Sequence, residues 1–249
     1  EVVLAELWTT PLTGDIPTDV LLRLPFLCAY IPLPVGATGH ASMAGMFVHL
    51  EQDANTKKPE LRFLVHLSND ELMMIPLDID ARVTLEKAVK RTFPFALKDV
   101  PEPERAMTEA YLEVVRKLTE PLVAITLYLC AANAEIRAPG TNAPTVFVRQ
   151  NPRKKMFAAS QPTSWNVAWR IGAALRRAGD AVSKAGQTTH GDGTKRPHMR
   201  RAHWHTYRTG SRADASAQKY ILHWLLPIPV NMPDDVDQSS WAELLPVTE

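Results

Sequence analysis

The spacing of apolar residues changes twice along the chain. In the first 80 residues, short apolar runs are bounded by polar, turn-forming residues, and this pattern predicts strands at 24–33, 43–50, 61–67 and 72–77. Prolines bound the first run, which favours a place near a sheet edge, because a missing amide hydrogen costs little there. The next two runs flank a polar linker and predict a β-hairpin, to which 72–77 adds a third strand.

From about residue 81 the apolar residues recur every three or four positions, which predicts helices. One short helix is expected at 83–93, and a longer one from the prolines and acids at 101–105 to about Asn133. The longer helix is expected to turn one apolar stripe toward the core. The stripe comprises Met107, Tyr111, Val114, Leu118, Leu122, Ile125 and Leu129.

A third helix is expected after Thr163 or Ser164, with Gly179 at its end and Trp165 and Trp169 on one side. The alternation of Val167 with residues 169 and 171 leaves a strand open as an alternative. Residues 183–194 hold no apolar residue larger than alanine and predict a mobile loop.

Two strands are predicted in the last third. Residues 199–209 are rich in β-branched and aromatic residues, and 219–231 is apolar on both alternating faces, which predicts a buried central strand paired with the first. The whole chain is therefore expected to be α+β, with amino-terminal antiparallel strands numbering about three, a helical middle and a basic carboxy-terminal sheet. We expect three parts, 1–80, 81–140 and 141–249, or one continuous domain.

Charge is unevenly distributed. Residues 149–219 hold fifteen Lys or Arg and three acids, a net charge of +12, which leaves −11 for the remainder of a chain whose total is +1. The basic third predicts a surface for anions or nucleic acid. The alternative is that this third docks on the acidic remainder of the same chain.

Composition restricts the class of protein. Cys28 and Cys130 are too few for a disulfide framework or a thiolate zinc site, which fits a reducing cytosol, and both are expected in the core. The longest apolar run, 121–132, is shorter than the roughly 20 residues of a membrane-spanning helix. The first ten residues lack the basic and apolar blocks of a secretion signal. No membrane span and no cofactor are predicted.

Cations, imidazoles and aromatic rings are densest in KRPHMRRAHWHTYRTG, residues 195–210. In a strand, His203, His205 and Tyr207 would project from one face, and residues 204, 206 and 208 from the other. The candidate binding residues are Arg200, Arg201, His203, Trp204, His205, Tyr207 and Arg208.

Three kinds of chemistry suit this segment. Paired imidazoles could bind a metal, but the nearest acid, Asp214, lies beyond a turn and arginines oppose a cation, so no metal is assigned. His49 and His66 could also face each other, without an acidic companion. His203 and His205 could serve as base and acid of a metal-independent ribonuclease. Recognition without catalysis is the leading hypothesis, because arginines and exposed aromatic rings bind phosphates, bases or acidic peptides.

The motif PHMRRAHWHTYRTG followed by HWLLPIPVN, with WRIGAALRRAG upstream, resembles a family of phage and plasmid proteins that includes an inhibitor of the type V-A CRISPR nuclease. The likeness is clearest over 165–231, and Ala202 stands where many relatives are expected to carry glycine. It implies an anti-CRISPR protein in the cytoplasm of a bacterial host, which recognises the amino-terminal segment of the nascent nuclease and triggers loss of its mRNA.

The resemblance also implies partners. The first is the amino-terminal peptide of the nuclease, and further ones are the ribosome, the mRNA or a host ribonuclease. It implies that the motif residues at 200–207 shape the peptide site or an RNA-facing surface. We therefore expect an adaptor without catalysis of its own; the alternatives are a ribonuclease and a nucleic-acid-binding protein of a mobile element.

Overall fold

The computed structural model of the chain describes most of its length. The described residues are 1–13, 15–33, 43–91, 100–137, 147–148, 155–156, 164–188, 196–211, 219–233, 236–237, 239 and 241.

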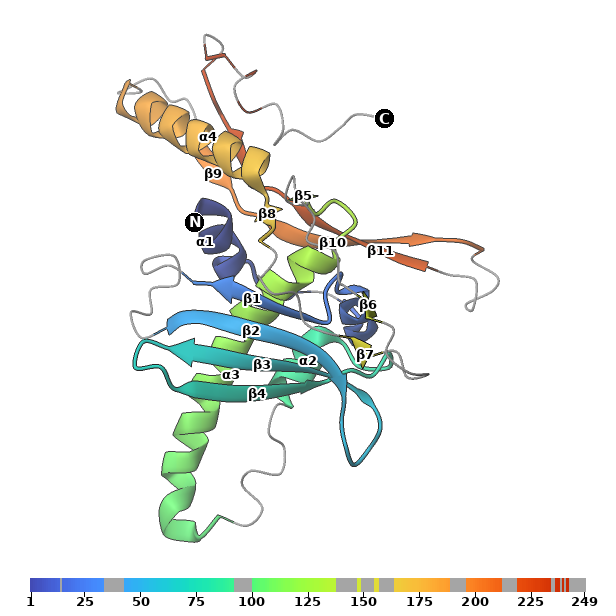
Figure 1. The fold of residues 1–249 in the computed structure, drawn as a ribbon. Helices are drawn as coiled ribbons and strands as arrows, with labels where there is room; N and C mark the ends of the chain where they lie inside the picture. Colours follow the sequence, from blue (N-terminus) through green and yellow to red (C-terminus); the bar gives the residue numbers. More distant parts are fainter. Residues whose placement is uncertain are drawn as a thin grey trace.

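The amino-terminal part is built on one antiparallel sheet (Figure 1). Its order is β1 (Cys28–Pro32), β2 (Met43–Gln52), β3 (Pro59–Leu67) and β4 (Leu72–Asp78). The hairpin and its third strand are confirmed. The sheet has four strands instead of about three because β1 joins it through β2, at the edge position that its prolines predicted.

Both free edges of this sheet carry a proline. The amides of Leu33 and Ile79 donate inward, to the carbonyl oxygens of Ala44 and Pro59, each at 3.1 Å. Backbone groups alternate along a strand, so Pro32 and Pro76 turn their nitrogens to the free edges. Each edge thereby lacks a donor that a further strand would need, which limits edge-to-edge association.

Apolar side chains on one face of the sheet, including Met46, Phe63 and Ile75, are fully buried. They share a core with α3 (Glu102–Cys130), which runs behind the sheet in Figure 1, and with α1 (Val2–Thr9). The 3-10 helix η1 (Thr18–Arg23) and α2 (Leu85–Lys90) also contact α3. Both helices predicted in the middle of the chain are therefore present.

The predicted core stripe of α3 is right at one end and wrong at the other. Leu122, Ile125 and Leu129 are buried, whereas Met107, Tyr111 and Val114 are exposed. The physical reason is length: α3 continues past β4, so its first half extends beyond the sheet (Figure 1). In this half the helix buries Leu112, Val115 and Thr119 instead.

The next helix, α4, spans Trp169–Thr188 and is longer than predicted. Gly179 lies inside it, and residues 183–188 are helical instead of a loop, while 189–194 fall outside the described residues. The strand alternative at 167–171 holds only for β8 (Asn166–Val167), which pairs with β5 (Ile136–Arg137). A further two-stranded pair joins β6 (Phe147–Val148) to β7 (Lys155–Met156).

The start of α4 is capped from elsewhere in the chain. The Glu135 carboxylate accepts hydrogen bonds from the amides of Arg170 at 3.0 Å and Ile171 at 3.4 Å. A negative charge is stabilising at a helix amino terminus. The predicted cap at residue 163 or 164 is therefore wrong, because the helix begins five residues later and a distant acid satisfies its first amides.

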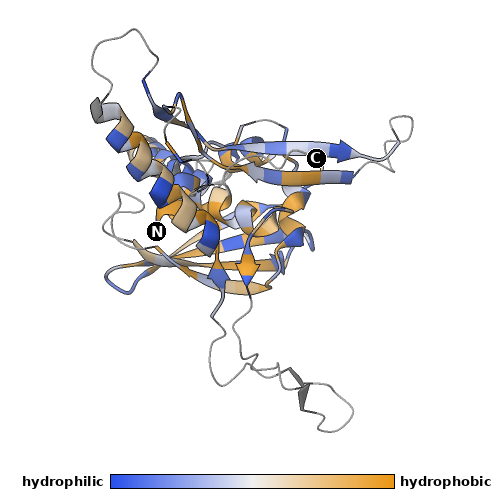
Figure 2. Cartoon of the chain, turned by 90° about the horizontal axis from the view of Figure 1, so that it is seen from above, coloured by the Kyte–Doolittle hydropathy of each residue, from blue (hydrophilic) through white to orange (hydrophobic). Residues whose placement is uncertain are grey.

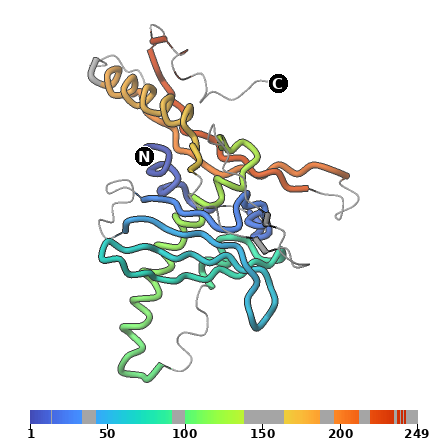
Figure 3. The backbone as a smooth tube through the Cα atoms, viewed as in Figure 1, coloured from blue at the N-terminus to red at the C-terminus, as the bar shows by residue number. Residues whose placement is uncertain are grey.

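The carboxy-terminal strands form a long two-stranded ribbon (Figure 3). In its outer half β10 (His203–Thr209) pairs with β11 (Lys219–Leu225), and in its inner half β9 (His198–Arg200) pairs with β12 (Ile228–Val230). The predicted pairing of these segments is confirmed. The prediction that 219–231 is a central strand is wrong, because within the described residues β11 pairs with one strand.

The free edge of β11 is joined to the end of α3. The Ala132 amide donates to the Leu222 carbonyl at 2.8 Å. The Asn133 side chain donates to the Trp224 carbonyl at 2.9 Å and accepts from its amide at 3.1 Å. The Trp224 ring, fully buried, meets Tyr128 edge-on with centroids 5.4 Å apart.

The largest buried cluster therefore includes side chains from each of the three predicted parts, such as Leu7, Leu122 and Trp224. The division at residues 80 and 140 stays a prediction. Within the described residues, no helix combines the length and apolar character that crossing a bilayer requires.

We expect Asn133→Ala to destabilise the fold by about 1–3 kcal/mol, because it removes the side-chain partner of both the amide and the carbonyl of Trp224, in two part-buried hydrogen bonds. Urea denaturation followed by circular dichroism measures this. Asn69→Ala, which removes an acceptor at an exposed turn, is the control and should change the free energy of unfolding by less than about 0.5 kcal/mol. Equal effects of the two substitutions would contradict the anchoring role.

The two cysteines should differ in reactivity. Cys28 is exposed, so its predicted place in the core is wrong, whereas Cys130 is buried. Burial raises the pKa of the Cys130 thiol to about 12. Because the thiolate is the reacting form, a thiol reagent at pH 8 should label Cys28 within minutes and Cys130 only after denaturation. Mass spectrometry of the labelled native protein checks this, and two rapid labels would contradict it.

Candidate functional site

The ribbon alternates its side chains between the body of the protein and solvent. Trp204, Leu222 and Trp224 turn inward and are buried. His205 and Tyr207 turn outward and are exposed, as the strand pattern predicts, while His203 is half-buried.

Register brings a second imidazole to the outer face. His205 lies directly opposite His223, and Tyr207 lies opposite Ile221. The Tyr207 ring packs edge-on against both imidazoles, with its centroid 4.4 Å from that of His205 and 5.0 Å from that of His223. We call His205, Tyr207 and His223 the imidazole–phenol cluster.

His223 is a member of the site that sequence reasoning missed. Pairing of its segment with the HWH strand was predicted, but membership depends on the register of that pairing. A shift by one residue would turn His223 to the inner face. The available signal was the repeat of the dipeptide His-Trp, at 203–204 and 223–224, in two strands expected to pair.

The predicted cations lie in two groups. Arg208 is near the outer end of β10, and its guanidinium lies over the Tyr220 ring, 5.3 Å from the centroid. Arg200 and Arg201 are exposed at the other end, where the ribbon is interrupted between β9 and β10. At about 3.3 Å per strand residue, Arg201 and Tyr207 are roughly 20 Å apart along the ribbon. The structure therefore does not bring all seven predicted residues together.

Trp204 serves the interior instead of the surface. Its side chain is 6% exposed, and its ring centroid lies 6.5 Å from that of Trp224. Its indole nitrogen is buried without a hydrogen-bond partner in the described part of the chain. A partner approaching the outer face does not reach this ring, so the residue supports the cluster by packing.

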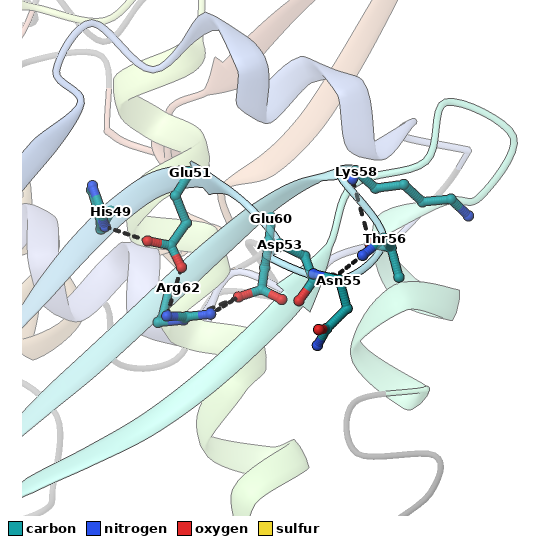
Figure 4. Close-up of polar contacts among 8 residues, drawn as sticks. All are labelled: His49, Glu51, Asp53, Asn55, Thr56, Lys58, Glu60 and Arg62. Atoms are coloured by element: carbon teal, nitrogen blue, oxygen red, sulfur yellow. Dashed lines mark hydrogen bonds and ion pairs between the residues drawn. The ribbon is translucent and has the colours of Figure 1, made fainter.

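The other histidine pair considered from sequence does not assemble. His49 lies opposite Arg62, and its Nδ1 is 3.1 Å from a Glu51 carboxylate oxygen (Figure 4). His66 lies opposite Gly45, and its ring nitrogens meet Tyr30 Oη at 3.2 Å and Asp70 Oδ1 at 3.1 Å. Across the described residues, no three His, Cys, Asp or Glu side chains are grouped so as to hold a metal ion.

The basic third contacts the acidic remainder at the start of α4. Arg170 forms an ion pair with Glu135, and its guanidinium also lies over the Trp169 ring, 5.3 Å from the centroid. Hydrophilic and hydrophobic residues are interleaved along this helix (Figure 2). Arg176 on the same helix is exposed, as are Arg200, Arg201 and Arg208 on the ribbon. Docking on the acidic part therefore accounts for Arg170 but leaves other cations facing solvent.

The outer face of the ribbon can perform two kinds of chemistry. Its rings offer planar surfaces for stacking against a base or an aromatic side chain. Its imidazole and phenol groups offer hydrogen-bond donors and acceptors. Lys219, paired with Thr209 on the same face two residues beyond Tyr207, adds positive charge for a phosphate or carboxylate, whereas Arg208 projects from the other face.

A known protein family and a solved structure resemble this chain. The sequence model of the family described as "AcrVA2-like: Anti-CRISPR type V subtype A2 family" matches residues 1–232, which include the sheet, α3, α4 and the ribbon. No curated protein matches the chain. The crystal structure of AcrVA2 has a similar fold, with a TM-score of 0.59 and 16% sequence identity over 91% of this chain and 68% of that chain.

We expect substitution of an inner-face ring and of an outer-face ring of the ribbon to differ in their effect on folding stability. Trp204→Ala should cost about 3–5 kcal/mol of folding stability, because it empties a buried aromatic site. Tyr207→Ala should cost less than about 1 kcal/mol, because the ring is 42% exposed. Thermal and urea unfolding measure both. A larger loss for Tyr207→Ala would mean that the cluster is structural.

Proposed function

The chain belongs to the type V subtype A2 anti-CRISPR family, and from that premise we propose that it binds the amino-terminal segment of a nascent type V-A CRISPR nuclease. Binding leads to loss of the nuclease mRNA, and the protein itself performs no catalysis. The observation that carries the proposal is the exposed imidazole–phenol cluster on a ribbon that extends from the body of the fold (Figure 3).

This surface has the chemistry of a peptide site. The Tyr207 ring and the two flanking imidazoles give a firm, partly apolar face with hydrogen-bonding groups at its edges, a combination enriched in protein interfaces. Lys219 lies on the same face of the ribbon, paired with Thr209, and attracts carboxylates. The recognised segment should therefore combine aromatic or apolar side chains with acidic ones.

Loss of the message requires a second activity in this proposal. The adaptor binds the emerging peptide while the ribosome still holds the message, so a host ribonuclease acting on that complex would find its target. The exposed cations of α4 and of the inner end of the ribbon, among them Arg176 and Arg200, are available for ribosomal or messenger RNA.

A ribonuclease is the second candidate, and one observation favours it. His205 and His223 both contact the Tyr207 ring, so two imidazoles lie on one exposed face next to cations. A general acid and a general base are arranged in this manner around a phosphodiester. This candidate uses His223 where sequence analysis proposed His203 beside His205.

The deciding experiment incubates purified protein with the nuclease mRNA, with and without translating ribosomes. We expect loss of the message only during translation, and we expect Tyr207→Ala to reduce that loss at least about tenfold by weakening peptide binding. Leu27→Ala, which changes an exposed apolar residue on the body, is the control.

The other outcomes identify the alternatives. Cleavage of naked RNA that His205→Ala or His223→Ala abolishes, with RNA affinity retained, would establish a ribonuclease. RNA binding without cleavage, falling steeply with salt, would indicate a nucleic-acid-binding protein. Failure of a synthetic peptide from the nuclease start to bind the protein would overturn the adaptor proposal.

A further inference from the structure

The strand β10 has one edge with which, within the described residues, no other strand pairs. It pairs with β11 on one side alone, and the two strands extend from the body of the protein (Figures 1 and 3). A free strand edge carries a row of amide and carbonyl groups that can pair with a further strand. Such an edge is either an aggregation hazard or a site to which an extended peptide adds as a strand.

The joint at Asn133 shows which backbone groups of β10 face this edge. The amide of Trp224 donates to the Asn133 side chain, and its carbonyl accepts from it, so both groups point away from β10. Residues directly opposite each other in an antiparallel pair turn their backbone groups either both toward each other or both away. Trp204 lies opposite Trp224, so its amide and carbonyl point to the free edge of β10.

Alternation along the strand extends this assignment to two further residues. Thr206 and Arg208 have the same orientation as Trp204, because the backbone groups of a strand point to alternate sides. Leu222, opposite Thr206, agrees with this, since its carbonyl accepts from Ala132 on the far side of β11. Thr206 is half-buried and Arg208 is exposed, so this part of the edge lies at the surface.

The free edges of the four-stranded sheet are protected, whereas this edge is not. Pro32 and Pro76 each remove a donor there, and Asn133 occupies the edge of β11 at its root. β10 contains no proline, and its pairing with β11 is continuous over its whole length. The Arg208 guanidinium lies over the Tyr220 ring of the paired strand. In the described part of the chain, no backbone hydrogen bond joins this edge to another element.

A strand added here would bring its side chains to the imidazole–phenol cluster. His205 and Tyr207 turn their backbone groups to β11, so a peptide residue beside either of them lies in the closer, non-hydrogen-bonded type of pair. Cβ atoms of such neighbours are about 5 Å apart on one face. Two alternate peptide residues therefore meet the rings of the cluster, and Arg208 on the other face favours an acidic residue at a neighbouring position.

We propose that the amino-terminal peptide of the nuclease binds as a third strand on the free edge of β10, an inference that rests on the proposed function. Main-chain hydrogen bonds to Trp204, Thr206 and Arg208 hold the peptide, and His205 and Tyr207 select its alternate side chains. The seven residues of β10 span roughly 23 Å at about 3.3 Å each, so the edge accommodates a segment of about seven residues. An unfolded nascent chain has the free backbone groups that this mode requires.

Peptides methylated at single backbone nitrogens test the mode of binding. The probe is a synthetic peptide that begins with the first residue of the nuclease, and its affinity for this chain is measured by calorimetry. Methylation at alternate residues should weaken binding at least about tenfold, because it removes a donor and obstructs the edge, whereas methylation at the residues between them should change affinity less than about threefold. Equal effects at all positions would overturn strand addition and leave the proposed function standing.

Thr206→Pro makes the same test on the protein. It removes an edge amide without breaking a hydrogen bond between β10 and β11, so we expect at least about tenfold weaker peptide binding with the circular dichroism spectrum retained. Thr206→Val keeps the amide and is the matched control, which should bind the peptide like the parent.

Amide hydrogen exchange followed by NMR tests the parent chain without a substitution. The amides of Thr206 and Arg208 should exchange rapidly in the free protein and at least about tenfold more slowly with saturating peptide. The amide of Tyr207 faces β11 and should be protected in both states.

Other outcomes would overturn the proposal. Unchanged exchange at Thr206 and Arg208, in a complex that Tyr207→Ala still weakens, would show that the peptide binds through side chains alone, and the proposed function would stand. A dimer of the free chain that Thr206→Pro dissociates, with peptide binding unaffected, would show that a second copy occupies the edge. Binding of RNA and of no peptide would overturn both this inference and the proposed function.

Discussion

The joint between Asn133 and the backbone of Trp224 is the interaction on which the rest of the structure depends. A two-stranded ribbon cannot bury enough apolar surface to be stable alone, so its root must be attached to something larger. One side-chain amide supplies both the donor and the acceptor that the free edge of β11 requires. The Trp224 ring then packs between Tyr128 and Trp204, so the backbone hydrogen bonds and the ring contacts of this residue occur at the same place.

That joint explains why the two faces of the ribbon differ in exposure. Its inner face carries Trp204, Leu222 and Trp224, which are committed to the core, while its outer face presents His205 and Tyr207 to another molecule. Because side chains alternate with a period of two, tight packing inside fixes which residues lie outside. His205 and Tyr207 are exposed, and His223 half-buried, as a consequence of the same register that buries the tryptophans.

Helix α3 connects two surfaces of different character. Its carboxy-terminal end is buried on all sides and holds the ribbon, whereas Met107, Tyr111 and Val114 on its amino-terminal half are exposed. With 29 residues at about 1.5 Å each, the helix is roughly 43 Å long, so the two surfaces are far apart.

By itself the sequence determined the longer strands, the pairing of the hairpin and of the ribbon, the two central helices, the α+β class and the family, because periodicity and rare motifs are local properties. The tertiary structure alone decided what each stripe faces. Met107 and Leu122 share one spacing, yet only Leu122 meets the sheet, since the reach of α3 depends on where β4 lies. Likewise, only the register of β10 on β11 brings His223 into the cluster and turns Trp204, a predicted binding residue, into the core. Glu135 caps α4 from a distant part of the sequence, which no local pattern encodes.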